Sequence, residues 1–142
     1  MPENTQVLAR PRVLLADDHA ETAEQLGELL RAHFDVVATV EDGLALLSAS
    51  TIFAPDVIVT DIAMPGLDGI EATRLIRRDH PTARVVFVTV HSEPALVDRC
   101  LAAGGLGYVL KDAAGEDLVA AVEAALRGER FVSEDIQWRM RG

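Results

Sequence analysis

Cysteine and long apolar runs are both scarce in this sequence. Cys100 is the only cysteine, so the chain cannot form an internal disulfide, and its apolar neighbours at helical spacing, Leu96, Val97 and Leu101, indicate a core residue in a reducing compartment. No run approaches the roughly 20 apolar residues of a membrane span, and residues 1–11 hold no apolar stretch of signal-peptide length. We therefore expect a cytoplasmic protein with no membrane partner.

Positive charge is also in short supply. The 13 Lys and Arg residues face 23 Asp and Glu residues, which gives a net charge of -10. This charge repels nucleic-acid backbones, so we expect protein partners and no direct nucleic acid binding by this chain. The sequence also has no Gly-x-x-x-x-Gly-Lys loop, no Gly-x-Gly-x-x-Gly fingerprint and no serine elbow. A phosphoryl group would therefore have to arrive on another molecule.

The sequence does contain a fivefold alternation of strand-like and helix-like segments. The predicted strands are Val13–Leu15, Val36–Val40, Val57–Val59, Val85–Val88 and Leu106–Leu110, and apolar residues between them recur at helical spacing. Near-continuous apolar strands that alternate with helices are typical of a parallel sheet covered on both faces. At 142 residues the chain has the length of one domain. We therefore predict a single doubly wound α/β domain of the (βα)5 type.

Polar side chains directly follow four of the predicted strands. Asp17 and Asp18 come after the first, Asp61 after the third, Thr89 after the fourth and Lys111 after the fifth. Ligands of open parallel sheets gather outside the carboxyl ends of the strands, so we expect these side chains to meet. Three close carboxylates repel by roughly 4 kcal/mol per pair at an effective dielectric of about 20. The cluster therefore predicts a divalent cation, and Mg2+ suits these oxygen ligands.

The same set of side chains suits phosphoryl transfer. One carboxylate can attack phosphorus while the metal and Lys111 neutralise the phosphoryl oxygens and Thr89 donates a hydrogen bond. Taken singly, each residue also has an ordinary explanation. An Asp before a helix is a common N-cap, and a strand Thr or a surface Lys is unremarkable. The convergence at successive strand ends carries the prediction.

In combination, these motifs resemble the receiver domains of two-component response regulators. The motifs are the Asp17-Asp18 pair, Asp61 followed by Met64-Pro65, Thr89, and Gly107-Tyr108-Val109-Leu110-Lys111. The resemblance implies a flavodoxin-like five-stranded parallel sheet in the order 2-1-3-4-5 with helices on both faces. It also implies that Asp61 is the phosphoacceptor.

The resemblance further assigns the remaining site residues. Mg2+ would be coordinated by Asp18, Asp61 and the Ala63 carbonyl, with Asp17 helping through water. Lys111 and Thr89 would contact the phosphoryl group, and Tyr108 would change orientation together with Thr89. Asp112 follows the lysine where many receivers have a proline in a cis peptide. The sequence therefore gives no prediction for the backbone path of the loop after the fifth strand.

The resemblance also implies partners and boundaries. The stretch Ala16-Asp17-Asp18-His19 and the stretch Gly128 to Ser133 are similar to the subgroup that precedes a LuxR/NarL-type helix-turn-helix domain. We expect an N-terminal extension at 1–11, the receiver at 12–130, and a tail at 131–142 that begins a linker to an effector domain. The expected partners are a histidine kinase or phosphotransfer protein and a second copy in a homodimer, with DNA reached only through the effector domain.

Three alternatives remain beside transcriptional control. A stand-alone receiver would act as a phosphate shuttle or sink. A phosphohydrolase with an Asp61 nucleophile would place a second acid two residues later, where Ala63 stands. A flavin carrier of similar fold would need a first loop rich in hydroxyl groups and glycine, and Asp17-Asp18 would repel its phosphate.

Overall fold

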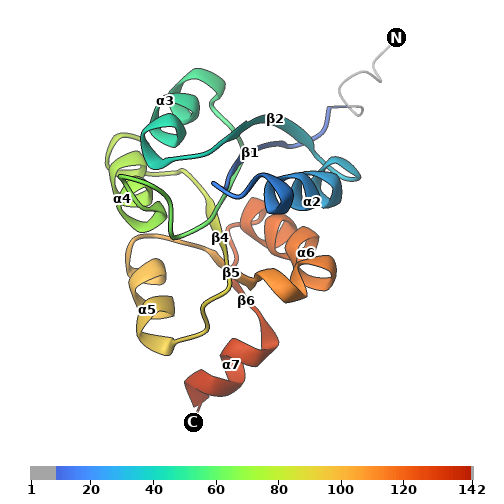
Figure 1. Ribbon diagram of the computed structural model, residues 1–142, viewed down its shortest axis with the longest axis vertical. Coiled ribbons are helices and arrows are strands. Elements are labelled where there is room, and N and C mark those ends of the chain that lie inside the picture. The colour runs from blue at the N-terminus through green and yellow to red at the C-terminus, as the bar shows by residue number, and fades with distance from the viewer. Residues whose placement is uncertain (1–8, 142) are drawn as a thin grey trace.

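The computed structural model describes residues 9–141, and a parallel sheet forms the central layer (Figure 1). Residues 1–8 of the expected N-terminal extension lie outside the described residues. The strands are β1 (Arg12–Ala16), β2 (Asp35–Val40), β3 (Val57–Thr60), β4 (Val85–Thr89), β5 (Gly107–Leu110) and β6 (Phe131–Val132). They lie in the order β2-β1-β3-β4-β5-β6, and each neighbouring pair is parallel.

The sheet has six strands, so the prediction of five strands was wrong, because it did not include β6. In β6, Phe131 is paired with Gly107 and Val132 with Tyr108. A strand of two residues is too short to show a period of its own, and its pairing depends on β5 being beside it. The five predicted strands and their order are confirmed.

Helices cover both faces of the sheet, as the doubly wound prediction requires. They are α2 (Ala20–Arg31), α3 (Gly43–Phe53), α4 (Gly69–Asp79), α5 (Pro94–Ala102), α6 (Ala114–Leu126) and α7 (Glu134–Arg141). One apolar core joins α2 and α6 to the sheet through residues such as Leu30 and Leu118. The other joins α3, α4, α5 and α7 to the opposite face through residues such as Leu46 and Ile136. Burying one such side chain contributes about 2 kcal/mol.

Short loops at the carboxyl ends of the strands set the backbone around the polar cluster. After β3, Asp68 caps α4 by accepting a hydrogen bond from the Glu71 amide at 2.8 Å. The Gly69 amide donates to the Ile62 carbonyl at 2.7 Å, and a Cβ on Gly69 would lie 2.1 Å from the Asp61 carbonyl oxygen. Only glycine permits this approach, which holds the loop after Asp61 in place. After β5, the stretch left open at Asp112 forms a 3-10 turn, η1 (Lys111–Ala113).

The segment after Arg130, expected as a tail, contains β6 and α7, and it packs on the sheet. The Ser133 amide donates to the Tyr108 carbonyl at 3.0 Å, and the Leu110 amide donates to Ser133 Oγ at 3.2 Å. Ile136 is fully buried in the core. No helix within residues 9–141 is long and apolar enough to cross a membrane.

Candidate functional site

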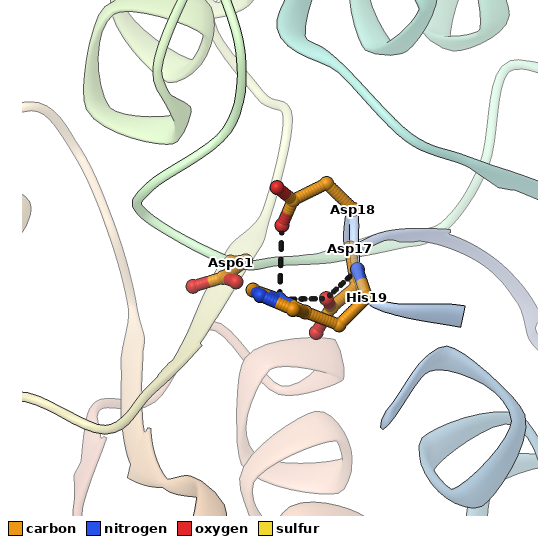
Figure 2. A group of neighbouring side chains, drawn as sticks. All are labelled: Asp17, Asp18, His19 and Asp61. Carbon is orange, nitrogen blue, oxygen red and sulfur yellow. Dashed lines mark hydrogen bonds and ion pairs between the residues drawn. The ribbon is translucent and has the colours of Figure 1, made fainter. Parts of the chain in front are cut away.

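Three carboxylates gather at the carboxyl edge of the sheet, meaning the edge at which β1, β3, β4 and β5 end. Asp17 and Asp18 follow β1 and Asp61 follows β3, and these strands are paired up to Ala16 and Thr60. The Asp61 amide donates to the Ala16 carbonyl at 2.9 Å, which continues the pairing into the site. One carboxylate oxygen from each acid and one His19 nitrogen lie within 4.8 Å of one another (Figure 2). The predicted convergence of the acids is therefore present.

Lys111 reaches this cluster from the end of β5. Its ammonium lies 2.9 Å from Asp17 Oδ2 and donates a hydrogen bond to Asp61 Oδ2 at 3.0 Å. Burial alone would lower the pKa of Lys111, but the hydrogen bonds and charges of Asp17 and Asp61 outweigh burial and raise the pKa above its usual value. The side chain is therefore a fixed positive charge between two acids.

The cluster is short of hydrogen bonds for its oxygens. Asp61 Oδ1 accepts a hydrogen bond from the Ile62 amide at 2.7 Å, and Asp17 Oδ1 accepts one from the His19 amide at 2.8 Å. The buried atoms Asp17 Oδ2 and Asp18 Oδ1 have no hydrogen-bond partner. Asp17 Oδ2 is instead ion-paired with the Lys111 ammonium at 2.9 Å, and Asp18 Oδ1 lies 3.1 Å from His19 Nδ1. Three carboxylates that share one lysine keep an excess of negative charge, which fits a site that takes a cation.

Two acids of the cluster precede a helix, and neither is its N-cap. The N-cap of α2 is His19, in an extended backbone conformation and without a side-chain capping bond. Asp17 is almost fully buried, with an exposed fraction of 1%, and Asp18 is half-buried. The ordinary explanation of the Asp17-Asp18 pair as a cap is therefore wrong, and both side chains belong to the cluster.

His19 is the neighbour that the sequence prediction missed. Its Nδ1 lies 3.1 Å from Asp18 Oδ1 and 3.5 Å from Asp17 Oδ1, while the ring is largely exposed. Figure 2 shows the imidazole turned toward the acids rather than away from them. Its position directly after an acid pair, at the start of a helix, was the available signal.

Thr89 and Tyr108 lie at the other half of the carboxyl edge, and both are fully buried. Thr89 Oγ1 accepts a hydrogen bond from the His91 amide at 3.1 Å, and the Tyr108 hydroxyl donates to the His91 carbonyl at 2.9 Å. Burial is the main cause that raises the pKa of Tyr108 above its ordinary value. Tyr108 is therefore not a half-exposed strand aromatic, because its ring already points inward.

Ala63 completes the set of predicted residues. It lies two residues after Asp61, in the loop before α4, and it is exposed. The structure thus brings Asp17, Asp18, Asp61 and Lys111 together. It places Thr89, Tyr108 and Ala63 on the same edge without joining them to the acids by a hydrogen bond.

Residues 13–123 match the model of the response regulator receiver domain. The chain belongs to the response regulator receiver family. The match decides for a receiver over a phosphohydrolase or a flavin carrier, and such a receiver is a signalling protein.

Relatives of known function place this receiver in the subgroup that the sequence indicated. The chain is 38% identical over 128 residues to the response regulator GacA of Pseudomonas viridiflava, covering 88% of this chain and 59% of GacA. The chain thus spans about three-fifths of the length of the curated relatives it matches.

Solved structures give the same placement. A two-component response regulator of the LuxR family from Aurantimonas sp. SI85-9A1 is similar with a TM-score of 0.87 and 36% identity, over 92% of this chain and 94% of that one. The RcsB response regulator of Salmonella typhimurium, in a structure concerned with its conformational dynamism for DNA interaction, has a TM-score of 0.83 and 30% identity, over 90% and 65%. The receiver fold and the LuxR/NarL subgroup are therefore shown.

Proposed function

We propose that Asp61 of this receiver accepts a phosphoryl group from a histidine kinase or phosphotransfer protein in a reaction that requires Mg2+. The observation that supports this most is the gathering of three carboxylates within reach of one ion, with the Lys111 ammonium shared between Asp17 and Asp61. One lysine does not neutralise three carboxylates, so the cluster keeps negative charge that a divalent cation would offset.

The transfer follows from the positions of the side chains. An oxygen of Asp61 forms a bond to phosphorus, the bond between phosphorus and the donor nitrogen breaks, and that nitrogen takes up a proton. Lys111, already beside Asp61, neutralises charge on the phosphoryl oxygens. Thr89, at the end of β4, would donate its hydroxyl hydrogen to one of these oxygens.

The metal would be held by the acids together with a backbone oxygen. Asp18, Asp61 and the Ala63 carbonyl would be direct ligands, and Asp17 would act through water. When bound, Mg2+ neutralises the carboxylates and the incoming phosphoryl oxygens. The donor set is all oxygen apart from His19, which suits a hard cation.

Phosphorylation would act on the half of the carboxyl edge that follows β4 and β5, where Thr89 and Tyr108 lie. Thr89 Oγ1 and the Tyr108 hydroxyl are both hydrogen-bonded to the backbone of His91. If the Thr89 hydroxyl is drawn toward the phosphoryl group, its hydrogen bond with the His91 amide would break. The loop after β4 would then move relative to β5. The similar response regulator RcsB, whose structures concern DNA interaction, supports transcription as the output, through a DNA-binding part outside these residues. RcsB dimers bound to DNA support self-association. The cytoplasm remains the expected location.

Intact-mass spectrometry tests the acceptor assignment. The wild type, incubated with an acyl phosphate and Mg2+, should gain the mass of one phosphoryl group, whereas chelator should prevent the gain. Asp61→Asn should gain nothing, because the amide is a poor nucleophile. Asp56→Asn is the matched control, since Asp56 is an exposed acid at the other end of β3. Equal labelling of wild type and Asp61→Asn would refute the assignment.

A further inference from the structure

The segment after Arg130 extends the sheet beside the strand that carries Lys111. In β6, Val132 is paired with Tyr108, and α7 follows directly (Figure 1). The Ser133 amide donates to the Tyr108 carbonyl at 3.0 Å, so the parallel ladder of β5 and β6 continues as far as Ser133. The family match ends at residue 123 and the expected receiver at 130, so this contact lies beyond both.

The backbone ladder between β5 and β6 stops at the next hydrogen bond. The bonds of a parallel ladder are evenly spaced, so the next one would run from the Leu110 amide to the Ser133 carbonyl. That carbonyl has instead turned into α7, where it accepts hydrogen bonds from the Ile136 and Gln137 amides, both at 3.0 Å. The start of α7 therefore takes away the backbone acceptor that a continued ladder would give to Leu110.

The side chain of Ser133 takes the place of that carbonyl. Its Oγ accepts a hydrogen bond from the Leu110 amide at 3.2 Å and donates one to Asp117 Oδ2, in the first turn of α6, at 2.9 Å. Ser133 is buried, with an exposed fraction of 2%. A serine ahead of a helix commonly caps that helix with its side-chain oxygen, whereas this hydroxyl bonds to β5 and α6. Ser133 therefore fixes the end of β5 to α6.

Lys111 extends from the backbone that Ser133 fixes. It directly follows Leu110, and its ammonium lies 2.9 Å from Asp17 Oδ2 and 3.0 Å from Asp61 Oδ2. A buried amide without a partner is unfavourable, so losing the Ser133 hydroxyl would favour a shift of the strand end or the entry of water. Either change would displace the backbone from which the Lys111 side chain reaches the acids.

We propose that Ser133 is a positioning residue for phosphoryl transfer, because its hydroxyl holds the end of β5 so that Lys111 is directed at Asp61. The proposal rests on the proposed function, in which Lys111 neutralises charge on the phosphoryl oxygens. A displaced charge stabilises the transition state less well. Phosphorylation of Asp61 would thus depend on a residue outside the expected receiver, and a force that displaces β6 and α7 would slow it.

The test compares initial rates of phosphorylation by an acyl phosphate with Mg2+, read from intact mass. Ser133→Ala should lower the rate about tenfold, because a displaced Lys111 is a poorer partner for the phosphoryl group. Mg2+ affinity, measured without a phosphodonor, should change less than about twofold, since the oxygen ligands lie after β1 and β3. Ser133→Thr keeps the hydroxyl and should recover most of the rate.

Two matched controls separate positioning from a general loss of hydrogen bonds. Ser50 is also buried, but its Oγ donates to the Leu47 carbonyl within α3, so Ser50→Ala should leave the rate unchanged. Asp117→Ala removes the acceptor of the Ser133 hydroxyl and should slow the reaction about twofold. Glu116→Ala, at an exposed acid in the same helical turn, should not slow it. If Ser133→Ala does not fold, the Asp117→Ala and Glu116→Ala pair decides the question.

Several results would overturn the role of Ser133. They are a wild-type rate in Ser133→Ala, an equal loss in Ser50→Ala, no recovery in Ser133→Thr, and a fall in Mg2+ affinity as large as the fall in rate. With Ser133→Ala unfolded, equal rates in Asp117→Ala and Glu116→Ala would overturn it too.

The proposed function fails separately, if the wild type gains no phosphoryl mass. In that case the hydrogen exchange of the Leu110 amide and the chemical shifts of the Lys111 side chain, both recorded without a phosphodonor, still test Ser133. We expect Ser133→Ala to raise the exchange rate and to shift the Lys111 signals, whereas Ser50→Ala should change neither. Unchanged values in Ser133→Ala would show that its hydroxyl does not position Lys111.

Discussion

The two halves of the carboxyl edge satisfy their polar groups in opposite ways. On the acidic half, after β1 and β3, buried oxygens of Asp17 and Asp18 lack hydrogen bonds. On the neutral half, after β4 and β5, the hydroxyls of Thr89 and Tyr108 are both bonded to His91. Lys111, at the end of β5, reaches across from the second half to the first.

We propose that this difference separates ligand binding from the readout of phosphorylation. Unsatisfied carboxylate oxygens lower stability until a cation arrives, whereas a paired buried hydroxyl contributes about 1 kcal/mol. The acidic half is therefore prepared for a ligand. The neutral half holds Thr89 and Tyr108 by two hydrogen bonds to the His91 backbone, and we propose that a phosphoryl group on Asp61 would accept the Thr89 hydroxyl hydrogen and draw Thr89 away from the His91 amide.

Removing the Lys111 charge should have the largest effect on stability. Lys111→Met leaves Asp17 and Asp61 without their cation, so we expect a loss of about 3 kcal/mol in the free energy of unfolding in chelator. Added Mg2+ should recover part of the loss, because it replaces the ammonium as a positive charge. Denaturant unfolding with chelator and with excess Mg2+ measures both effects, and Lys111→Arg is the charge-retaining control.

The pH dependence of that loss follows from the raised pKa of Lys111. A lysine whose pKa is raised by folding stabilises the protein fully below its unfolded value of about 10.4, and the stabilisation disappears as the pH rises through the folded value. The difference in free energy of unfolding between wild type and Lys111→Met should therefore be constant near neutral pH and shrink above about pH 10.5. A gap that is unchanged in strong alkali would show that lost packing, not charge, is the cause.

Thr89→Ala should break the link between the halves while leaving the acids intact. It removes the hydrogen bond to the His91 amide, which costs about 1 kcal/mol, and it removes the proposed contact with the phosphoryl group. We expect Asp61 still to be phosphorylated, with most of the phosphorylation-driven change in self-association or in Tyr108 environment lost. Sedimentation and tyrosine chemical shifts measure these changes.

Thr73→Ala is the control for that experiment, because Thr73 is also fully buried but bonds to Gly69 within α4. It should lose similar stability and keep the response. An unchanged response in Thr89→Ala would move the coupling to the loop between Asp61 and Gly69.

Asp18→Asn should produce the smallest effect, and its sign is opposite. It removes one negative charge from a crowded cluster, so the melting temperature in chelator should rise by the equivalent of less than about 1 kcal/mol. The gain on adding Mg2+ should shrink, because a ligand is lost. Thermal melts in the two buffers test both parts. A lower metal-free melting temperature would contradict a strained cluster.

Strand positions and the acid cluster were predictable from sequence because both depend on local patterns. Five Val- and Ile-rich blocks formed β1 to β5, and the residues after them converge because parallel strands end at one edge. β6 was not predictable, since Phe131 and Val132 form a strand only by pairing with β5.

Side-chain contacts across the sheet could not be predicted from the sequence either. The contact of Lys111 with Asp17 depends on how far one side chain extends over two strands. The inward ring of Tyr108 depends on a hydrogen bond to His91, 17 residues away in sequence. Both are tertiary properties that periodicity does not encode.

The most direct test of phosphorylation on Asp61 locates the phosphoryl group itself. Wild-type protein is phosphorylated with an acyl phosphate and Mg2+, reduced with borohydride so that an aspartyl phosphate becomes homoserine, and digested for peptide mass spectrometry. We predict homoserine at position 61, and none at 17, 18 or 56. Homoserine at another acid, or a phosphoryl group that resists reduction, would contradict it.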